Sequence, residues 1–159
     1  MTAEPTTTEP AAARRHHVCH PGDGTNLGAI GLGIYTRLTG ADTNGAYSLF
    51  EYVVPPGLGG PPTHVHSRED ELFTCVQGRV IVELDGEPHE LGVGDSLLMP
   101  RGVPHVFYNP FEDETRIVAV VSPPGLENYY RELSQLPPGR DMTLVAEVMT
   151  RYGLSLQKK

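Results

Sequence analysis

The stretches HVHSREDELFTCVQG, residues 64–78, and GDSLLMPRGVPHVFYN, residues 94–109, decide the fold and the chemistry of this chain. Together they place three histidines, His64, His66 and His105, and the carboxylate of Glu71 at defined spacings. Imidazole nitrogens and carboxylate oxygens are ligands that divalent transition metals accept. The two stretches therefore predict one metal site built from separate parts of the sequence.

Strand geometry explains how these side chains meet. Successive side chains of a β-strand point to opposite faces, so His64 and His66 share one face while Val65 lies on the other. The polar residues 67–70 then form a turn, which lets Glu71 open the next strand beside the histidines. His105 is expected on a later strand and supplies the third imidazole.

An isolated His-x-His pair is more often a solvated or buried pair than a metal site. Here the pair is followed by a glutamate and a glycine, and then by a second box of ordered residues. That box contains Gly94, Pro100, Gly102, His105 and Asn109. The combined order favours a metal site over a chance pair.

These boxes resemble the two motifs of the cupin superfamily, G-x5-H-x-H-x3,4-E-x6-G and G-x5-P-x-G-x2-H-x3-N. The second motif is met in full, and the first is met at His64, His66, Glu71 and Gly78. Its leading glycine would fall at Leu58, between Gly57 and Gly59. The resemblance implies an all-β fold, a small double-stranded β-helix, jelly-roll-like barrel. It also implies that the metal ligands are His64, His66, Glu71 and His105.

Composition supports one β-rich domain. The chain has 159 residues, with 18 Gly and 15 Pro, which favours short strands separated by turns. We expect a disordered or arm-like segment over 1–26, the barrel over 27–122 and a helical extension over 123–159. Strands are expected near 29–38, 46–54, 63–66, 71–77, 79–85, 88–91, 96–99, 104–109 and 115–122. Apolar spacing predicts two C-terminal helices, from about 126 to 133 and from 141 to 152.

Charge and hydropathy narrow the function classes. The formal net charge is −8 and no extended basic cluster is present, so we expect no nucleic-acid partner. No apolar run of signal-peptide or membrane-span length occurs, which predicts a cytoplasmic protein without membrane contact. Cys19 and Cys75 are expected to be free thiols.

The resemblance also bears on the reaction. The His-x-His-x4-Glu spacing and the segment PPGLENYY, residues 123–130, resemble single-domain quercetin 2,3-dioxygenase-like cupins. This implies a metal-dependent oxygenase for a flavonol-like or polyketide-like enol, with dioxygen as co-substrate and Glu71 as both ligand and general base. Fe, Ni or Mn is favoured, although the same ligands accept Co, Cu or Zn.

Two alternatives to the oxygenase stay open. One is a non-redox isomerase, cyclase or dehydratase, and the other is a small-molecule-binding module without turnover. Strand alternation predicts a substrate pocket of apolar side chains. Its candidates are Tyr47, Leu49, Phe73, Cys75, Val82, Leu97, Met99 and Phe107.

Two further features concern assembly and the N-terminal arm. The apolar residues of segment 27–38 and of the trailing helices favour a homodimer. The tract around His16, His17, Cys19 and His20 resembles an auxiliary metal site in composition. A mobile arm, or a strand lent to a partner subunit, accounts for this tract better.

Overall fold

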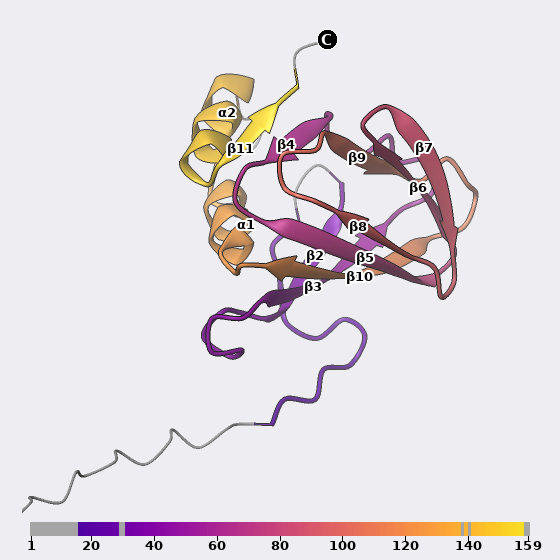
Figure 1. Ribbon diagram of the computed structural model, residues 1–159, viewed down its shortest axis with the longest axis horizontal. Coiled ribbons are helices and arrows are strands. Elements are labelled where there is room, and N and C mark those ends of the chain that lie inside the picture. Colours follow the sequence, from indigo (N-terminus) through magenta and orange to yellow (C-terminus); the bar gives the residue numbers. More distant parts are fainter. Residues whose placement is uncertain (1–15, 29–30, 138, 140, 158–159) are drawn as a thin grey trace, which may run out of the picture.

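A computed structural model describes residues 16–28, 31–137, 139 and 141–157, and Figure 1 shows its fold. Within these residues the chain forms strands and two short helices. The elements are β1 (Thr25–Asn26), β2 (Gly33–Leu38), β3 (Ser48–Val54), β4 (His64–His66), β5 (Asp70–Gln77), β6 (Arg79–Leu84), β7 (Glu87–Gly92), β8 (Ser96–Met99), β9 (His105–Tyr108), β10 (Thr115–Ser122), α1 (Leu126–Ser134), α2 (Met142–Arg151) and β11 (Leu154–Leu156).

The strands form two antiparallel sheets that enclose the core. One sheet has the order β1-β2-β3-β10-β5-β8, and the other has the order β11-β4-β9-β6-β7. The sheets face each other in Figure 1, and strands that follow one another in sequence often lie in different sheets. The predicted all-β barrel with two C-terminal helices is confirmed.

Side-chain alternation explains how each sheet packs. In β5 the buried residues Glu71, Phe73 and Cys75 alternate with the exposed or partly exposed Leu72 and Thr74. β10 alternates in the same way along its length. Apolar side chains on the inner faces are therefore buried against one another, away from solvent. Burial of this kind supplies most of the stabilisation of a small barrel.

Gly78, the last residue of the first box, is required by the turn between β5 and β6. Its φ of 70° lies in the left-handed region. A Cβ at this position would lie 2.6 Å from the carbonyl oxygen of Glu114 and 2.9 Å from Oγ1 of Thr115. A residue other than glycine would therefore meet both backbone strain and a steric clash.

The C-terminal segment is more closely joined to the barrel than the sequence predicts. Both expected helices are present, and the side chain of Asp141 caps α2 by accepting a hydrogen bond from the backbone N–H of Thr143. The chain then returns as β11, which was not predicted. β11 pairs antiparallel with β4, so that Leu154 faces His66 and Leu156 faces His64 in register.

Both helices lie on one side of the barrel, next to β4 and β11 (Figure 1). Leu126 and Leu133 of α1 are buried, as are Val148 and Met149 of α2, and these residues pack with the barrel core. In the described part of the chain, neither helix has the length and apolar character needed to cross a bilayer.

Candidate metal centre

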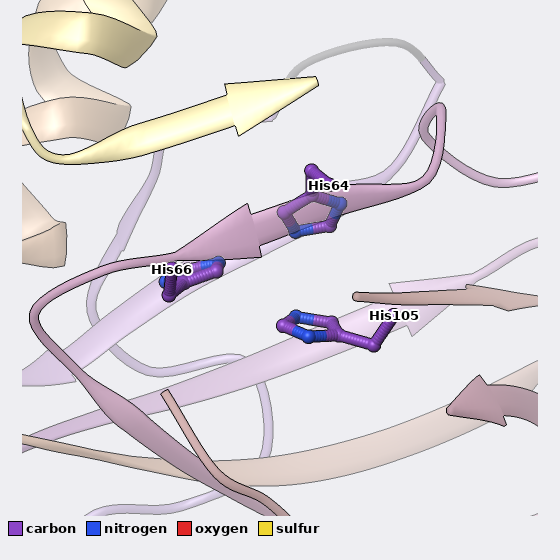
Figure 2. Close-up of side chains that lie close together, drawn as sticks. All are labelled: His64, His66 and His105. Atoms are coloured by element: carbon purple, nitrogen blue, oxygen red, sulfur yellow. The ribbon is translucent and has the colours of Figure 1, made fainter. Parts of the chain in front are cut away.

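The three histidines of the two boxes lie together on neighbouring strands. Strand β4 carries His64 and His66, and its neighbour β9 begins with His105, whose Cα is paired in register with that of His64. Figure 2 shows the three imidazoles facing one another. One ligand atom from each ring lies within 4.8 Å of the other two. The structure thus brings together side chains that are 41 positions apart in sequence (105 − 64).

Backbone carbonyls fix the orientation of two of these rings. Nδ1 of His64 lies 3.0 Å from the carbonyl oxygen of Pro62, and Nδ1 of His105 lies 3.0 Å from that of Val103. A carbonyl only accepts hydrogen bonds, so each Nδ1 carries the proton and each Nε2 has a free lone pair. These are the tautomers that bind a metal through Nε2.

His66 is oriented by a carboxylate rather than by a carbonyl. Its Nδ1 lies 3.5 Å from Oε2 of Glu69, and the two side chains are 2% and 6% exposed. Metal-binding histidines usually direct their second nitrogen at such an acceptor. Glu69 was not predicted as a site residue, because the polarity of residues 67–70 predicts a turn. The available signal was an acidic residue three positions after a predicted ligand.

Glu71 enters the same space from β5 in the other sheet. Its Oε2 lies 3.3 Å from Nε2 of His105 and 3.9 Å from Nε2 of His66. Burial alone would raise the pKa of Glu71, but the adjacent imidazoles, His66 first, lower it to about 2. Burial, followed by repulsion from the other two imidazoles, lowers the pKa of His64 to about 3.

The donor set fits a divalent metal ion. Nε2 of His105 is buried and has no hydrogen-bond partner, although it faces the carboxylate of Glu71. Buried polar atoms are rarely left unpaired, so an unpaired nitrogen beside two other imidazoles fits the role of a cation ligand. Neutral imidazoles suit divalent transition metals and do not select one of them. Glu71 as the fourth ligand stays a prediction.

An apolar pocket of about 200 Å³ opens beside the histidines. His64 belongs both to the three-histidine group and to the pocket wall. The remaining lining comes from β2 and the residue before it, a proline-rich loop, β9 and the two C-terminal helices. It comprises Leu32, Ile34, Pro61, Pro62, Phe107, Tyr129, Tyr130, Leu133, Met142, Val145 and Met149.

Of the side chains predicted to line a pocket, Phe107 lines this one. Tyr47 is 38% exposed, and Leu49 is partly buried on β3. The others pack in or against the core, namely Phe73, Cys75, Val82, Met99 and Leu97. The difference arises because α1 and α2 form much of the pocket wall, whereas strand alternation considers only the barrel strands.

The N-terminal histidine tract does not form a second cluster. Nε2 of His17 lies 3.8 Å from Oδ1 of Asp42, and the thiol of Cys19 contacts the carbonyl oxygen of Arg37. Within the ranges that the structure describes, the one group arranged to hold a metal consists of His64, His66 and His105. Cys19 and Cys75 are both free, as expected.

Fold and site together define a small β-barrel with a candidate histidine metal centre. The family model described as a cupin domain matches residues 50–121. The polyketide cyclase RemF from Streptomyces resistomycificus has the same fold, with a TM-score of 0.57 and 24% identity over 67% of this chain and 79% of that one. The chain is therefore similar to cupin-domain proteins, in the sequence of residues 50–121 and in its fold.

Two curated proteins match parts of the chain. A segment of 60 residues is 37% identical to the polyketide synthase CurC of Streptomyces cyaneus, covering 38% of this chain and 39% of that protein. A segment of 83 residues is 30% identical to the probable oxidoreductase virH of Hypocrea virens, covering 50% of this chain and 38% of that protein. The chain thus spans about two-fifths of the length of these relatives.

Proposed function

We propose that this protein is a metal-dependent enzyme that closes or aromatises rings in a polyketide-like, enolic aromatic substrate without using dioxygen. One observation carries the proposal: His64 is shared by the histidine cluster and the wall of an apolar pocket. A substrate in that pocket would place an oxygen beside the metal ligands. The names of CurC and RemF support the substrate class, since both refer to polyketide chemistry.

The chain supplies the main requirements of such a reaction. The three Nε2 atoms and Glu71 would hold the ion, which when bound supplies Lewis acidity to an enolisable carbonyl. Glu71 is ionised and can accept the proton that leaves the carbon next to this carbonyl. The adjacent imidazoles hold the pKa of Glu71 below its ordinary value, so as a base it needs a substrate whose carbon acid is strongly activated. The carbanion would then attack a second carbonyl carbon to form the ring bond, and the resulting alkoxide would take the proton back from Glu71. Loss of that hydroxyl group together with an adjacent C–H proton releases one water and leaves a C=C bond, with no net change of oxidation state.

The pocket wall favours this chemistry as well. Apolar side chains from α1 and α2, such as Leu133, Val145 and Met149, surround the space next to His64. They exclude water and strengthen electrostatic interactions at the reacting carbonyl. The reaction is redox-neutral, so it needs no oxidant. The residues described and the bound ion are sufficient for it.

An oxygenase is the second candidate function. His64, His66, His105 and Glu71 would hold the ion, which when bound to these ligands could supply redox chemistry toward an oxygen-bearing substrate. The similarity to a probable oxidoreductase supports this alternative. In this case Glu71 would remove the proton of an enol or phenol before the ring is cleaved.

The decisive experiment compares turnover with and without dioxygen. Protein of measured metal content is incubated with an aromatic poly-β-ketone under argon and in air. The proposal expects equal rates of ring closure, with one water lost per ring and no dioxygen consumed. His105→Ala should lose both bound metal and turnover, whereas His89→Ala, on strand β7 outside the cluster, should keep them.

Three results contradict the cyclase. Dioxygen uptake that is required for turnover would favour the oxygenase. Equal activity in His105→Ala and wild-type protein would remove the metal centre from the mechanism. Absence of any reaction with enolic aromatics, after loading with Zn, Fe, Ni, Co and Mn in turn, would contradict both enzymes and favour a binding module.

A further inference from the structure

A pair of tyrosine hydroxyl groups connects the pocket wall to the barrel core. Oη of Tyr130, on α1, lies 2.9 Å from Oη of Tyr52, on β3. Tyr130 lines the pocket, whereas Tyr52 is only 1% exposed. Neither residue belongs to the candidate metal ligands, and the sequence argument singled out neither of them as a site residue.

Aromatic rings enclose the inner member of this pair. The ring of Tyr52 stacks on Phe107 with centroids 5.7 Å apart, and meets Phe73 edge-on at 5.5 Å. The ring of Phe50 also stacks with Tyr52, with centroids 6.1 Å apart. Within the described residues, the hydroxyl of Tyr52 forms its hydrogen bond with the hydroxyl of Tyr130. Tyr52 therefore has one acceptor to which it can donate its proton.

This enclosure sets the direction of the hydrogen bond. A buried hydroxyl that donates to nothing is costly, so the favoured arrangement has Tyr52 donating and Tyr130 accepting. A tyrosine hydroxyl can accept one hydrogen bond and still donate another. The proton of Tyr130 then remains available to a molecule in the pocket.

We infer that Tyr130 is a substrate-binding residue that donates a hydrogen bond to an oxygen carried by an aromatic ring, and that Tyr52 positions it. The inference rests on the proposed function in one respect, namely that the apolar pocket is the substrate site. The hydrogen bond from Tyr130 also predicts which ligands the pocket prefers. The pocket prefers oxygen-bearing aromatic ligands, phenols or aryl ketones, over hydrocarbons of the same shape.

The electrostatic surroundings keep the donor in its protonated form. Burial, followed by the charge of Glu71, raises the pKa of Tyr130 well above its ordinary value. Burial likewise raises the pKa of Tyr52. Both phenols therefore stay neutral at physiological pH, and Tyr130 can donate to a ligand oxygen.

The size of the pocket limits the ligand. Its volume of about 200 Å³ lies below the roughly 300–1,000 Å³ typical of pockets for drug-sized ligands. One or two fused rings, or one end of a longer molecule, therefore suit it. Naphthalene derivatives are appropriate probes, since their rings can stack against Phe107 and Tyr129 while a substituent reaches Tyr130.

The test measures how strongly the protein distinguishes two probes of nearly equal shape. 1-Naphthol carries a hydroxyl where 1-methylnaphthalene carries a methyl group. Dissociation constants for both are measured by fluorescence on protein of known metal content. We define the ratio as the dissociation constant of 1-methylnaphthalene divided by that of 1-naphthol. This ratio should fall roughly fivefold in Tyr130→Phe, because one neutral hydrogen bond is lost.

Two further variants separate binding from structure. Tyr52→Phe leaves the donor on Tyr130 but removes its positioning, so the ratio should fall by about half as much on a logarithmic scale. Tyr152→Phe is the matched control, because its hydroxyl bonds Glu132 outside the pocket and its loss should leave the ratio unchanged. Thermal unfolding confirms that each variant is folded.

An unchanged ratio in Tyr130→Phe would overturn the inference, and so would failure of both probes to bind the wild-type protein. An unchanged ratio in Tyr52→Phe would remove its positioning role. The assay needs no turnover, so it is independent of the proposed reaction. A protein that shows the preference but closes no ring would retain the binding inference and refute only the cyclase.

Discussion

Replacement of Glu69 by glutamine tests whether this carboxylate supports the metal centre. Oε2 of Glu69 lies 3.5 Å from Nδ1 of His66, and neither atom has a hydrogen-bond partner. When Nε2 of His66 donates its lone pair to an ion, positive charge spreads over the ring, and the buried carboxylate stabilises that charge. Glutamine keeps the shape and an oxygen but removes the negative charge.

The magnitude follows from the burial of the pair. Loss of a partner behind a metal-binding histidine weakens metal binding by about 10- to 100-fold. Glutamine can still accept a hydrogen bond from Nδ1, so we expect the lower end, an approximately tenfold loss or about 1.4 kcal/mol. The metal-free protein should not lose stability, because a buried carboxylate without a well-formed hydrogen bond costs desolvation energy.

Competition with a chromophoric chelator measures the affinity for Zn²⁺ and for Ni²⁺, and thermal unfolding is followed on metal-free protein. Glu90→Gln is the control, because Glu90 lies in an exposed ion pair with Arg79 and should leave metal affinity unchanged. If Glu69→Gln binds both ions as tightly as the wild type, the carboxylate does not support His66. An equal loss in Glu90→Gln would show that total charge, rather than the contact, sets the affinity.

Two other predictions concern the C-terminal segment. Ending the chain at Gly153 removes β11. Loss of the buried Leu154 alone should lower the free energy of unfolding by about 2 kcal/mol, or Tm by roughly 4–8 °C. Metal binding should also weaken, because β4 loses the strand that pairs with it. Calorimetry and chelator competition check this, and an unchanged Tm would show that β11 contributes nothing. Glu127 accepts hydrogen bonds from the hydroxyl of Ser48 and the backbone of Gly125, which outweigh burial and lower its pKa. The stabilisation by the Glu127 carboxylate is present above the unfolded-state pKa and is lost as pH falls through the lower folded-state pKa. Glu127→Gln should therefore lower Tm by about 3–6 °C at pH 7, and by less at an acidic pH below the folded-state pKa. Equal losses at both pH values would refute the assignment to the ionised form.

The sequence predicted best those features that depend on local patterns. Alternation placed His64 and His66 on one face, and the spacing to His105 matched a known motif, so the meeting of these three side chains could be anticipated. The long alternating strands β5 and β10 were likewise expected in nearly their observed bounds. Each of these predictions needs only strand periodicity and a motif that already encodes the pairing of distant strands.

Features that depend on tertiary packing were missed. β11 is a three-residue strand, too short to show any period, and it exists because β4 offers a free edge. Glu69 lies in a segment whose polarity predicts an exposed turn, yet the fold buries it behind His66. The pocket wall follows from the placement of α1 and α2, which no local pattern specifies.

The helices that line the pocket are connected along the chain to strands that lie beside the metal ligands. α1 follows directly from β10, whose neighbour β5 carries Glu71, and α2 leads directly into β11, whose neighbour β4 carries His64 and His66. The helices that line the pocket are therefore joined at both ends to strands that border the metal ligands. Substitutions on the helix faces, at Val145 or Met149, can reshape the pocket without altering a ligand. Specificity in this fold can therefore change through the helices, while the chemistry stays with the barrel.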